Sequence, residues 1–125
     1  MLNHTNVHHE INYIELSATD MAETKRFYGE AFDWQFNDYG PEYAGIRRRE
    51  TEGECGGICL AANVTTGGPL VILYSLDLES SSAAVQKAGG RVTQEIFSFP
   101  GGRRFHFLDP SGNQLAVWSD QPHQA

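Results

Sequence analysis

The chain lacks the features that mark several large classes of protein. It has only two cysteines, Cys55 and Cys59, among 125 residues, too few for the disulfide framework of a small secreted domain. No apolar run approaches the roughly 20 residues that span a bilayer. The N-terminal residues also lack the basic and apolar blocks of a signal peptide. We therefore expect a cytoplasmic protein that has no membrane partner.

Positive charge is scarce as well. Nine Lys and Arg stand against 16 Asp and Glu, which gives a net charge of −7. This balance argues against a nucleic-acid partner, because phosphate attraction requires a basic face. Five of the nine basic residues nevertheless fall in two short runs, 47–49 and 103–104. Such runs are either solvated strand edges or guanidinium groups that bind an anionic small molecule.

What the chain does have is a unit that occurs twice. Residues 11–34 and 70–92 each open with a strand-like apolar run, and each reaches an Asp that suits the N-cap of a helix. These two residues, Asp20 and Asp77, are 77 − 20 = 57 positions apart. A duplication of this length predicts two small modules that close one core by packing together.

Periodicity within each unit predicts one strand, one helix and three further strands. Alternation over residues 10–18 predicts the first strand, and an apolar stripe at helical spacing after Asp20 predicts the first helix. Residues 63–69 are the linker-like stretch between the units. We predict an α+β fold in a single domain over residues 1–125. Module one spans about 10–62 and module two about 69–119, each with the order βαβββ.

Three segments resemble a known family: FYGEAFDW, KAGGRV and FHFLDPSGNQLAVW. In this order, on a duplicated βαβββ pattern, they resemble the vicinal oxygen chelate superfamily of glyoxalases, bleomycin resistance proteins and extradiol dioxygenases. The resemblance covers residues 11–119. It implies a glyoxalase-like fold, in which two modules curl a mixed sheet around a cavity. It also implies a homodimer, which would cover the open strand edges.

In the metal-dependent members, His or Glu ligands come from the first and last strands of each module. Carried over by spacing, those positions fall here on Tyr13, Leu70, Ala116 and, by the 57-residue offset, Cys59. A gap would move the last of these to Leu60 or Ala61. Zinc or iron needs about three or four protein ligands, so we expect no metal or other cofactor. A non-standard site that includes Tyr13, Glu15 and Cys59 stays open.

Strand alternation assigns the side chains that line the expected cavity. Tyr13 and Glu15 face it, while Ile14 and Leu16 pack on the helix. In the second module, burial of the two phenylalanines in FHF turns their neighbours Arg104 and His106 to the cavity side. Glu15 and His106 are the candidate catalytic residues. The candidate substrate-binding residues are Tyr13, Arg47, Tyr74, Arg104, Gln114 and Trp118.

Each candidate also has an ordinary structural interpretation. A buried carboxylate without a partner costs several kcal/mol, so Glu15 either pairs with an Arg or His or meets solvent or ligand. His106 suits acid–base chemistry, but the more ordinary interpretation is a strand histidine with satisfied hydrogen bonds. The aromatic side chains either fill the concave face or line a small-molecule site.

Two classes of function remain, and both have a small molecule as the partner. In the first, the protein is an enzyme of this superfamily, of lyase, isomerase or dioxygenase-like type. It would act without the usual metal, with Glu15 and His106 as base and acid. In the second, it is a non-catalytic binding protein that sequesters an antibiotic-like or anionic small molecule.

Overall fold

The computed structural model describes residues 2–3 and 6–123. No helix in these ranges is both long and apolar enough to cross a membrane. The elements, in chain order, are β1 (Leu2–Asn3), β2 (Ile14–Ala18), α1 (Met21–Phe32), β3 (Phe36–Asp38), β4 (Tyr43–Arg47), β5 (Thr51–Glu52), β6 (Glu54–Leu60), β7 (Val71–Tyr74), α2 (Leu78–Lys87), β8 (Arg91–Phe99), β9 (Gly102–Leu108) and β10 (Gln114–Ser119).

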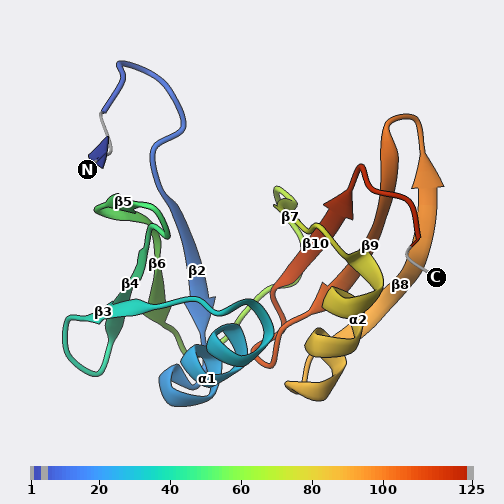
Figure 1. Cartoon of the computed structure of the whole chain (residues 1–125). Helices are drawn as coiled ribbons and strands as arrows, with labels where there is room; N and C mark the ends of the chain where they lie inside the picture. Colours follow the sequence, from blue (N-terminus) through green and yellow to red (C-terminus); the bar gives the residue numbers. More distant parts are fainter. Residues whose placement is uncertain (1, 4–5, 124–125) are drawn as a thin grey trace.

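The two modules have the same strand order. Module one forms a four-stranded sheet in the order β2-β6-β4-β3, and module two forms one in the order β7-β10-β9-β8. In each sheet the first strand of the module is parallel to the last, and the remaining pairs are antiparallel. The predicted α+β fold with two βαβββ modules is confirmed. Among the described residues the sheets stay separate, so one chain presents two open halves rather than a closed sheet (Figure 1).

The predicted helix caps are present in both modules. The Asp20 side chain accepts a hydrogen bond from the backbone N–H of Glu23 at 3.0 Å, and Asp77 accepts one from Ser80 at 3.1 Å. Each cap satisfies an N–H group that has no partner within the helix, which is worth about 1 kcal/mol. Past the end of α2, Gly89 adopts a φ of 103°, a left-handed conformation that suits glycine.

Both helices pack between the sheets, in one core that the modules share (Figure 1). Phe27 and Tyr28 of α1 are fully buried together with Phe105 and Phe107 of β9. The predicted alternation holds for Leu16, which is buried. Ile14 was expected on the helix side but is 42 % exposed, because β2 begins at this residue and its side chain borders a small cavity.

A buried aspartate joins the modules. Asp109 is only 4 % exposed, and its Oδ1 atom accepts hydrogen bonds from the three backbone N–H groups of residues 111–113. Its Oδ2 atom accepts from the Tyr28 hydroxyl of α1 at 2.8 Å. The Asn113 amide donates to the Ser17 carbonyl of β2 at 2.6 Å. Burial, together with the Asp109 carboxylate, raises the pKa of Tyr28 well above its ordinary value. The turn of module two is thus hydrogen-bonded to a helix and a strand of module one.

Candidate functional site

Each sheet has one face on the shared core and one face turned away from it, here called the outer face. Because the helices and the core lie between the sheets, the outer faces of the two modules both point away from that core (Figure 1). Strand pairing fixes which side chains share an outer face. Glu15 lies opposite Gly57 in module one, and Trp118 lies opposite Arg104 in module two.

The outer face of module one carries a hydrogen-bonded chain of phenols and carboxylates. The Tyr13 and Tyr43 hydroxyls lie 2.7 Å apart, and Tyr43 donates to Oε2 of Glu15 at 3.0 Å. Burial and the hydrogen bonds with Tyr13 and Glu15 raise the pKa of Tyr43, so its phenol stays protonated at neutral pH. Tyr43 therefore holds the Glu15 carboxylate in place by a charge-assisted hydrogen bond.

A second carboxylate, Glu54, extends this chain across the sheet. It accepts hydrogen bonds from Tyr39 at 2.6 Å and from Asn37 at 2.9 Å, and it lies 3.4 Å from the Tyr13 hydroxyl. These hydrogen bonds, that of Tyr39 above all, lower the pKa of Glu54, so the group is negatively charged at neutral pH. Sequence reasoning found Tyr13 and Glu15 but missed Glu54 and its donors.

Two glycines make room for these long side chains. A Cβ atom at Gly57 would lie 2.0 Å from the Tyr43 hydroxyl, and one at Gly45 would lie 2.1 Å from the Glu54 carboxylate. The phenols and carboxylates therefore lie flat over strands that present no side chain beneath them. Glycines inside predicted strands are the sequence signal that could have pointed to this close approach.

The outer face of module two is aromatic. The Arg104 guanidinium lies over the Phe97 and Phe99 rings, at 5.4 and 5.6 Å from their centroids. Trp118 contacts Tyr74 edge-on, with ring centroids 5.3 Å apart, and lies 6.4 Å from Phe99. The predicted residues Arg104, Tyr74 and Trp118 are thereby brought to one surface.

His106 lies on the same surface, beside Gln114. The Gln114 amide nitrogen is 3.4 Å from Nδ1 of His106, and Phe97 lies 5.8 Å away. Nε2 of His106 is buried and has no hydrogen-bond partner among the described residues. Burial first, and the charge of Arg104 second, lower the pKa of His106 below 6.5. The imidazole is therefore neutral at pH 7.

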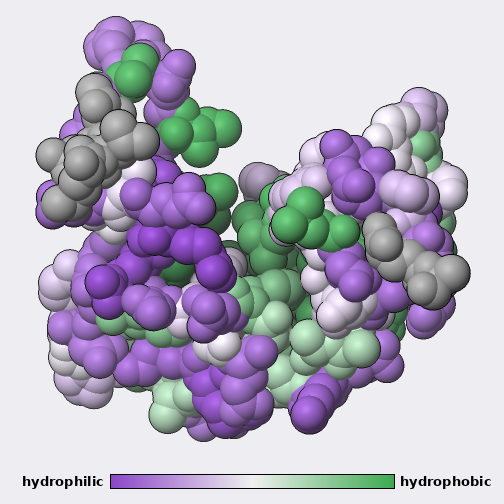
Figure 2. Space-filling model, in the orientation of Figure 1, coloured by the Kyte–Doolittle hydropathy of each residue, from purple (hydrophilic) through white to green (hydrophobic). Residues whose placement is uncertain are grey.

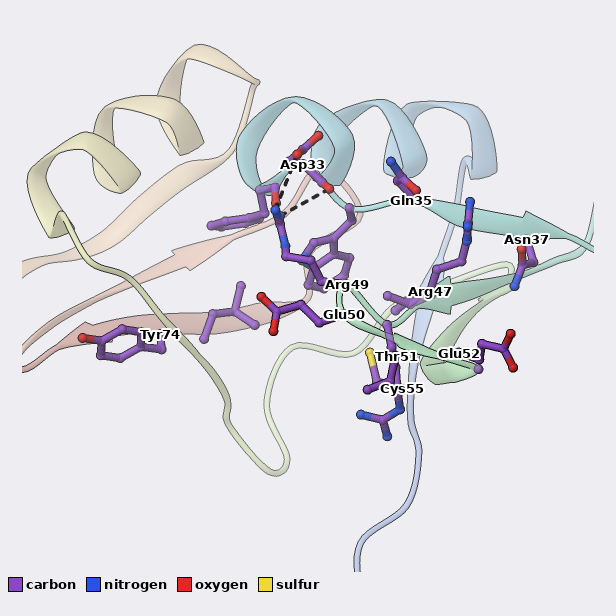
Figure 3. Close-up of a pocket in the computed structure, with 16 residues that line it drawn as sticks. Asp33, Gln35, Asn37, Arg47, Arg49, Glu50, Thr51, Glu52, Cys55 and Tyr74 are labelled. Carbon is purple, nitrogen blue, oxygen red and sulfur yellow. Dashed lines mark hydrogen bonds and ion pairs between the residues drawn. The ribbon is translucent and has the colours of Figure 1, made fainter. Parts of the chain in front are cut away.

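A large cleft of about 1080 Å³ lies between the modules and is lined by residues of both. Figure 2 shows the molecule hollowed at this place. Arg47, Arg48 and Arg49 line one wall, and Tyr74 of β7 lines the opposite wall (Figure 3). Arg49 donates to the Phe32 carbonyl at 3.0 Å, so it caps the end of α1.

A second cavity, of about 220 Å³, brings Glu15 of module one next to Gln114 of module two. Arg104, His106 and Trp118 line neither of these two described cavities. Within one chain, Glu15 and His106 thus lie on the outer faces of different sheets. Their meeting in a single pocket stays a prediction.

Strand pairing moves one of the four positions at which the resemblance places metal ligands. Ala116 pairs with Ile72, and Glu15 pairs with Gly57. Because 72 − 15 = 57 is the module offset, the counterpart of Ala116 is Gly57 and not Cys59. Tyr13 then supplies the single side-chain donor at the four positions, which does not fit a metal centre. Within residues 2–3 and 6–123 no three His, Cys, Asp or Glu side chains are grouped so that they could hold a metal ion.

Comparisons with known proteins agree with this architecture. The model of the Glyoxalase/Bleomycin resistance protein/Dioxygenase superfamily matches residues 10–117. No curated protein matches the chain. A glyoxalase-related enzyme from Fulvimarina pelagi superposes with a TM-score of 0.74 at 20% identity, covering 89% of this chain and 88% of that chain. A glyoxalase/bleomycin resistance protein/dioxygenase family enzyme from Burkholderia phytofirmans PsJN gives 0.75 at 14% identity, with coverages of 90% and 99%. TioX from Micromonospora sp. ML1 gives 0.66 at 18%, with coverages of 90% and 99%. At these identities the likeness shows the fold alone.

Proposed function

Because the chain belongs to the glyoxalase/bleomycin resistance protein/dioxygenase superfamily, we propose that it binds a small organic molecule between outer faces of its modules. The observation that carries the proposal is the aromatic outer face of module two. There Trp118 is half-buried, and Tyr74 and Ile72 are 48 % and 43 % exposed. Aromatic walls with a few polar groups are typical of small-molecule sites.

The same proposal includes a homodimer. The outer faces of the two modules point away from the core that the modules share. A second copy of the chain is therefore needed to bring a module-one face against a module-two face. The module-one face carries the carboxylates of Glu15 and Glu54, whereas the module-two face carries Arg104. A ligand held between unlike faces would therefore meet carboxylates on one wall and Arg104 on the other. Sedimentation at micromolar concentration should give a dimer, and a lone species of 13.9 kDa would contradict this part.

The two tryptophans allow a direct test of the site. Trp118 lies on the outer face of module two, whereas Trp34 lines the large cleft. In a screen of ring-containing fragments by NMR, we expect binders to shift the indole N–H signal of Trp118 and to leave that of Trp34 in place. The signals are assigned with the Trp118→Phe and Trp34→Phe variants. Binders that shift Trp34 alone would move the site to the cleft.

A catalytic function is the second candidate, and the surroundings of two groups favour it. Glu15 is an exposed carboxylate held by Tyr43, and His106 is a neutral imidazole. Two titratable groups in different environments suit proton transfer. If the protein is an enzyme of this type, Glu15→Gln and His106→Gln should abolish turnover of a bound compound while its affinity is kept. Turnover that survives both changes would rule out these roles.

A further inference from the structure

We propose that the ligand of this site is a flat, ring-containing anion, a carboxylate or a phosphate ester, whose acid group binds Arg104 and whose ring lies on Trp118. The inference rests on the proposed function, because it names the class of ligand for the module-two outer face.

Arg104 is half-buried and has no acidic partner among the described residues, whereas Arg47, Lys87 and Arg91, which also form no ion pair there, are exposed. The chain has 16 Asp and Glu for nine Lys and Arg, and within the described residues Lys25, Arg26, Arg49 and Arg103 form ion pairs with carboxylates. Within the described residues, no carboxylate lies within 4 Å of the Arg104 guanidinium. A half-buried cation without a counter-ion, in a chain rich in acids, is suited to receive its anion from outside.

The neighbouring residue shows what pairing looks like in the same strand. Arg103 points to the opposite face of β9, where both of its terminal nitrogens donate to Glu79 of α2. This bidentate pair holds α2 to the sheet. Arg104 instead lies over two phenylalanine rings and reaches no carboxylate. Adjacent arginines thus serve different purposes, one within the fold and one at the surface.

The rings around Arg104 fix its orientation. Phe97 and Phe99 of β8 hold the planar guanidinium at 5.4 and 5.6 Å from their centroids, a geometry that stabilises the cation and leaves the edge of the plane for hydrogen bonds. A carboxylate or phosphate accepts two such bonds from arginine. His106 is neutral beside it, so a single fixed positive charge sets the place of the acid group.

Trp118 supplies the surface for the ring. It is the cross-strand partner of Arg104 in the β9–β10 ladder, so the acid and the ring of one compact ligand can reach both side chains. Its indole is held edge-on by Tyr74, whose hydroxyl donates to Asp120 at 2.6 Å. The Asp120 carboxylate therefore already accepts a hydrogen bond from within the fold. A planar ring stacks well on a tryptophan that is fixed in this way.

Two probes of nearly equal shape test whether binding requires a negative charge on the ligand. 2-Naphthoate carries the carboxylate, and 2-naphthamide replaces it with a neutral group. Titration of the wild-type protein, followed by the indole N–H signal of Trp118, should show naphthoate binding about 10-fold or more tightly than naphthamide. The Arg104→Gln variant should bind naphthoate about 10- to 100-fold more weakly, the loss of a charge-assisted hydrogen bond, and naphthamide unchanged. Arg91→Gln, an exposed arginine of β8, is the matched control and should change neither affinity.

The possible results separate the two proposals. Equal affinities for both probes, with Trp118 shifted, would overturn the anion but leave the proposed site. No shift of Trp118 by either probe up to millimolar concentration would overturn both. An equal loss in Arg91→Gln and Arg104→Gln would show attraction by net charge alone and would overturn the role of Arg104. If Arg104→Gln fails to fold, Arg104→Lys replaces it. That variant should bind naphthoate more weakly than wild type, because lysine lacks the planar fork, and unchanged affinity would contradict the inference.

Discussion

Module one and module two have the same strand order but different outer faces. Gly45 and Gly57 pair across the first sheet where His106 and Ala116 pair across the second. In module one, the missing side chains leave room for phenols and carboxylates to lie flat. In module two, the larger residues support an aromatic surface with a single arginine. The comparison shows that strand pairing sets the positions of the side chains on each sheet. The volume of the residues in the middle of the sheet then decides whether its outer face is polar or aromatic.

The hairpins that close the two sheets also differ. The β4–β6 hairpin is a surface feature, since its arginines line the open cleft. The corresponding β9–β10 hairpin turns inward, where Asp109 bonds to module one. The β4–β6 hairpin therefore lies at the surface, whereas the β9–β10 hairpin holds the two modules together.

Removal of the Asp109 side chain should give the largest difference in stability between changes in the two hairpins. Asp109→Ala leaves the buried donors of the turn and of Tyr28 without an acceptor, which should lower the free energy of unfolding by about 3 kcal/mol or more. The matched change in the other hairpin, Glu50→Ala, removes an exposed side chain and should stay within about 0.5 kcal/mol. Urea denaturation measures both. Similar losses in the two variants would show that the hairpins do not differ in role.

Adding a side chain at Gly57 in module one should have the next largest effect on stability. A Cβ at Gly57 would overlap the Tyr43 hydroxyl, so Gly57→Ala should cost about 1–3 kcal/mol by overpacking. In a Tyr43→Ala background the largest overlap is gone, and the Tyr13 hydroxyl, 2.7 Å from the added Cβ, can move into the vacated space, so the same change should cost much less. The two variants and their double mutant, compared by urea denaturation, measure this coupling. A cost that is the same in both backgrounds would mean that Gly57 is needed for another reason.

The smallest expected effect concerns pH. The pKa of His106 is lowered on folding, so its stabilising contribution is fully present above the ordinary value of 6.5 and is lost as the pH falls through the lowered value. Module one has Gly45 at this position and contributes nothing comparable. Between pH 7 and pH 5, the melting temperature of the wild type should fall more than that of His106→Gln. Parallel falls in the two proteins would contradict the assignment.

Much of the fold follows from particular residues. Asp20 and Asp77 predicted the duplicated modules, and the buried phenylalanines of FHF placed Arg104 and His106 correctly on one face. The partners of Glu54 could not be predicted, because they depend on β6 lying beside β2 on one side and on β3 lying beyond β4 on the other. The metal position was misplaced at Cys59 for a similar reason. Ala116 and Gly57 are 116 − 57 = 59 positions apart, so the 57-residue offset fails after the hairpin. The domain limits and the candidate site residues stay predictions.

The most direct test of the central claim, that unlike outer faces of two copies form one site, is complementation. One variant carries Tyr13→Ala and Tyr43→Ala in the module-one face, and the other carries Arg104→Gln and Trp118→Ala in the module-two face. Each alone should bind 2-naphthoate weakly. After mixing and exchange of subunits, about a quarter of the sites should combine two intact faces in a two-fold dimer, and titration should recover that fraction of tight binding. A mixture that binds no better than its two components would contradict the account.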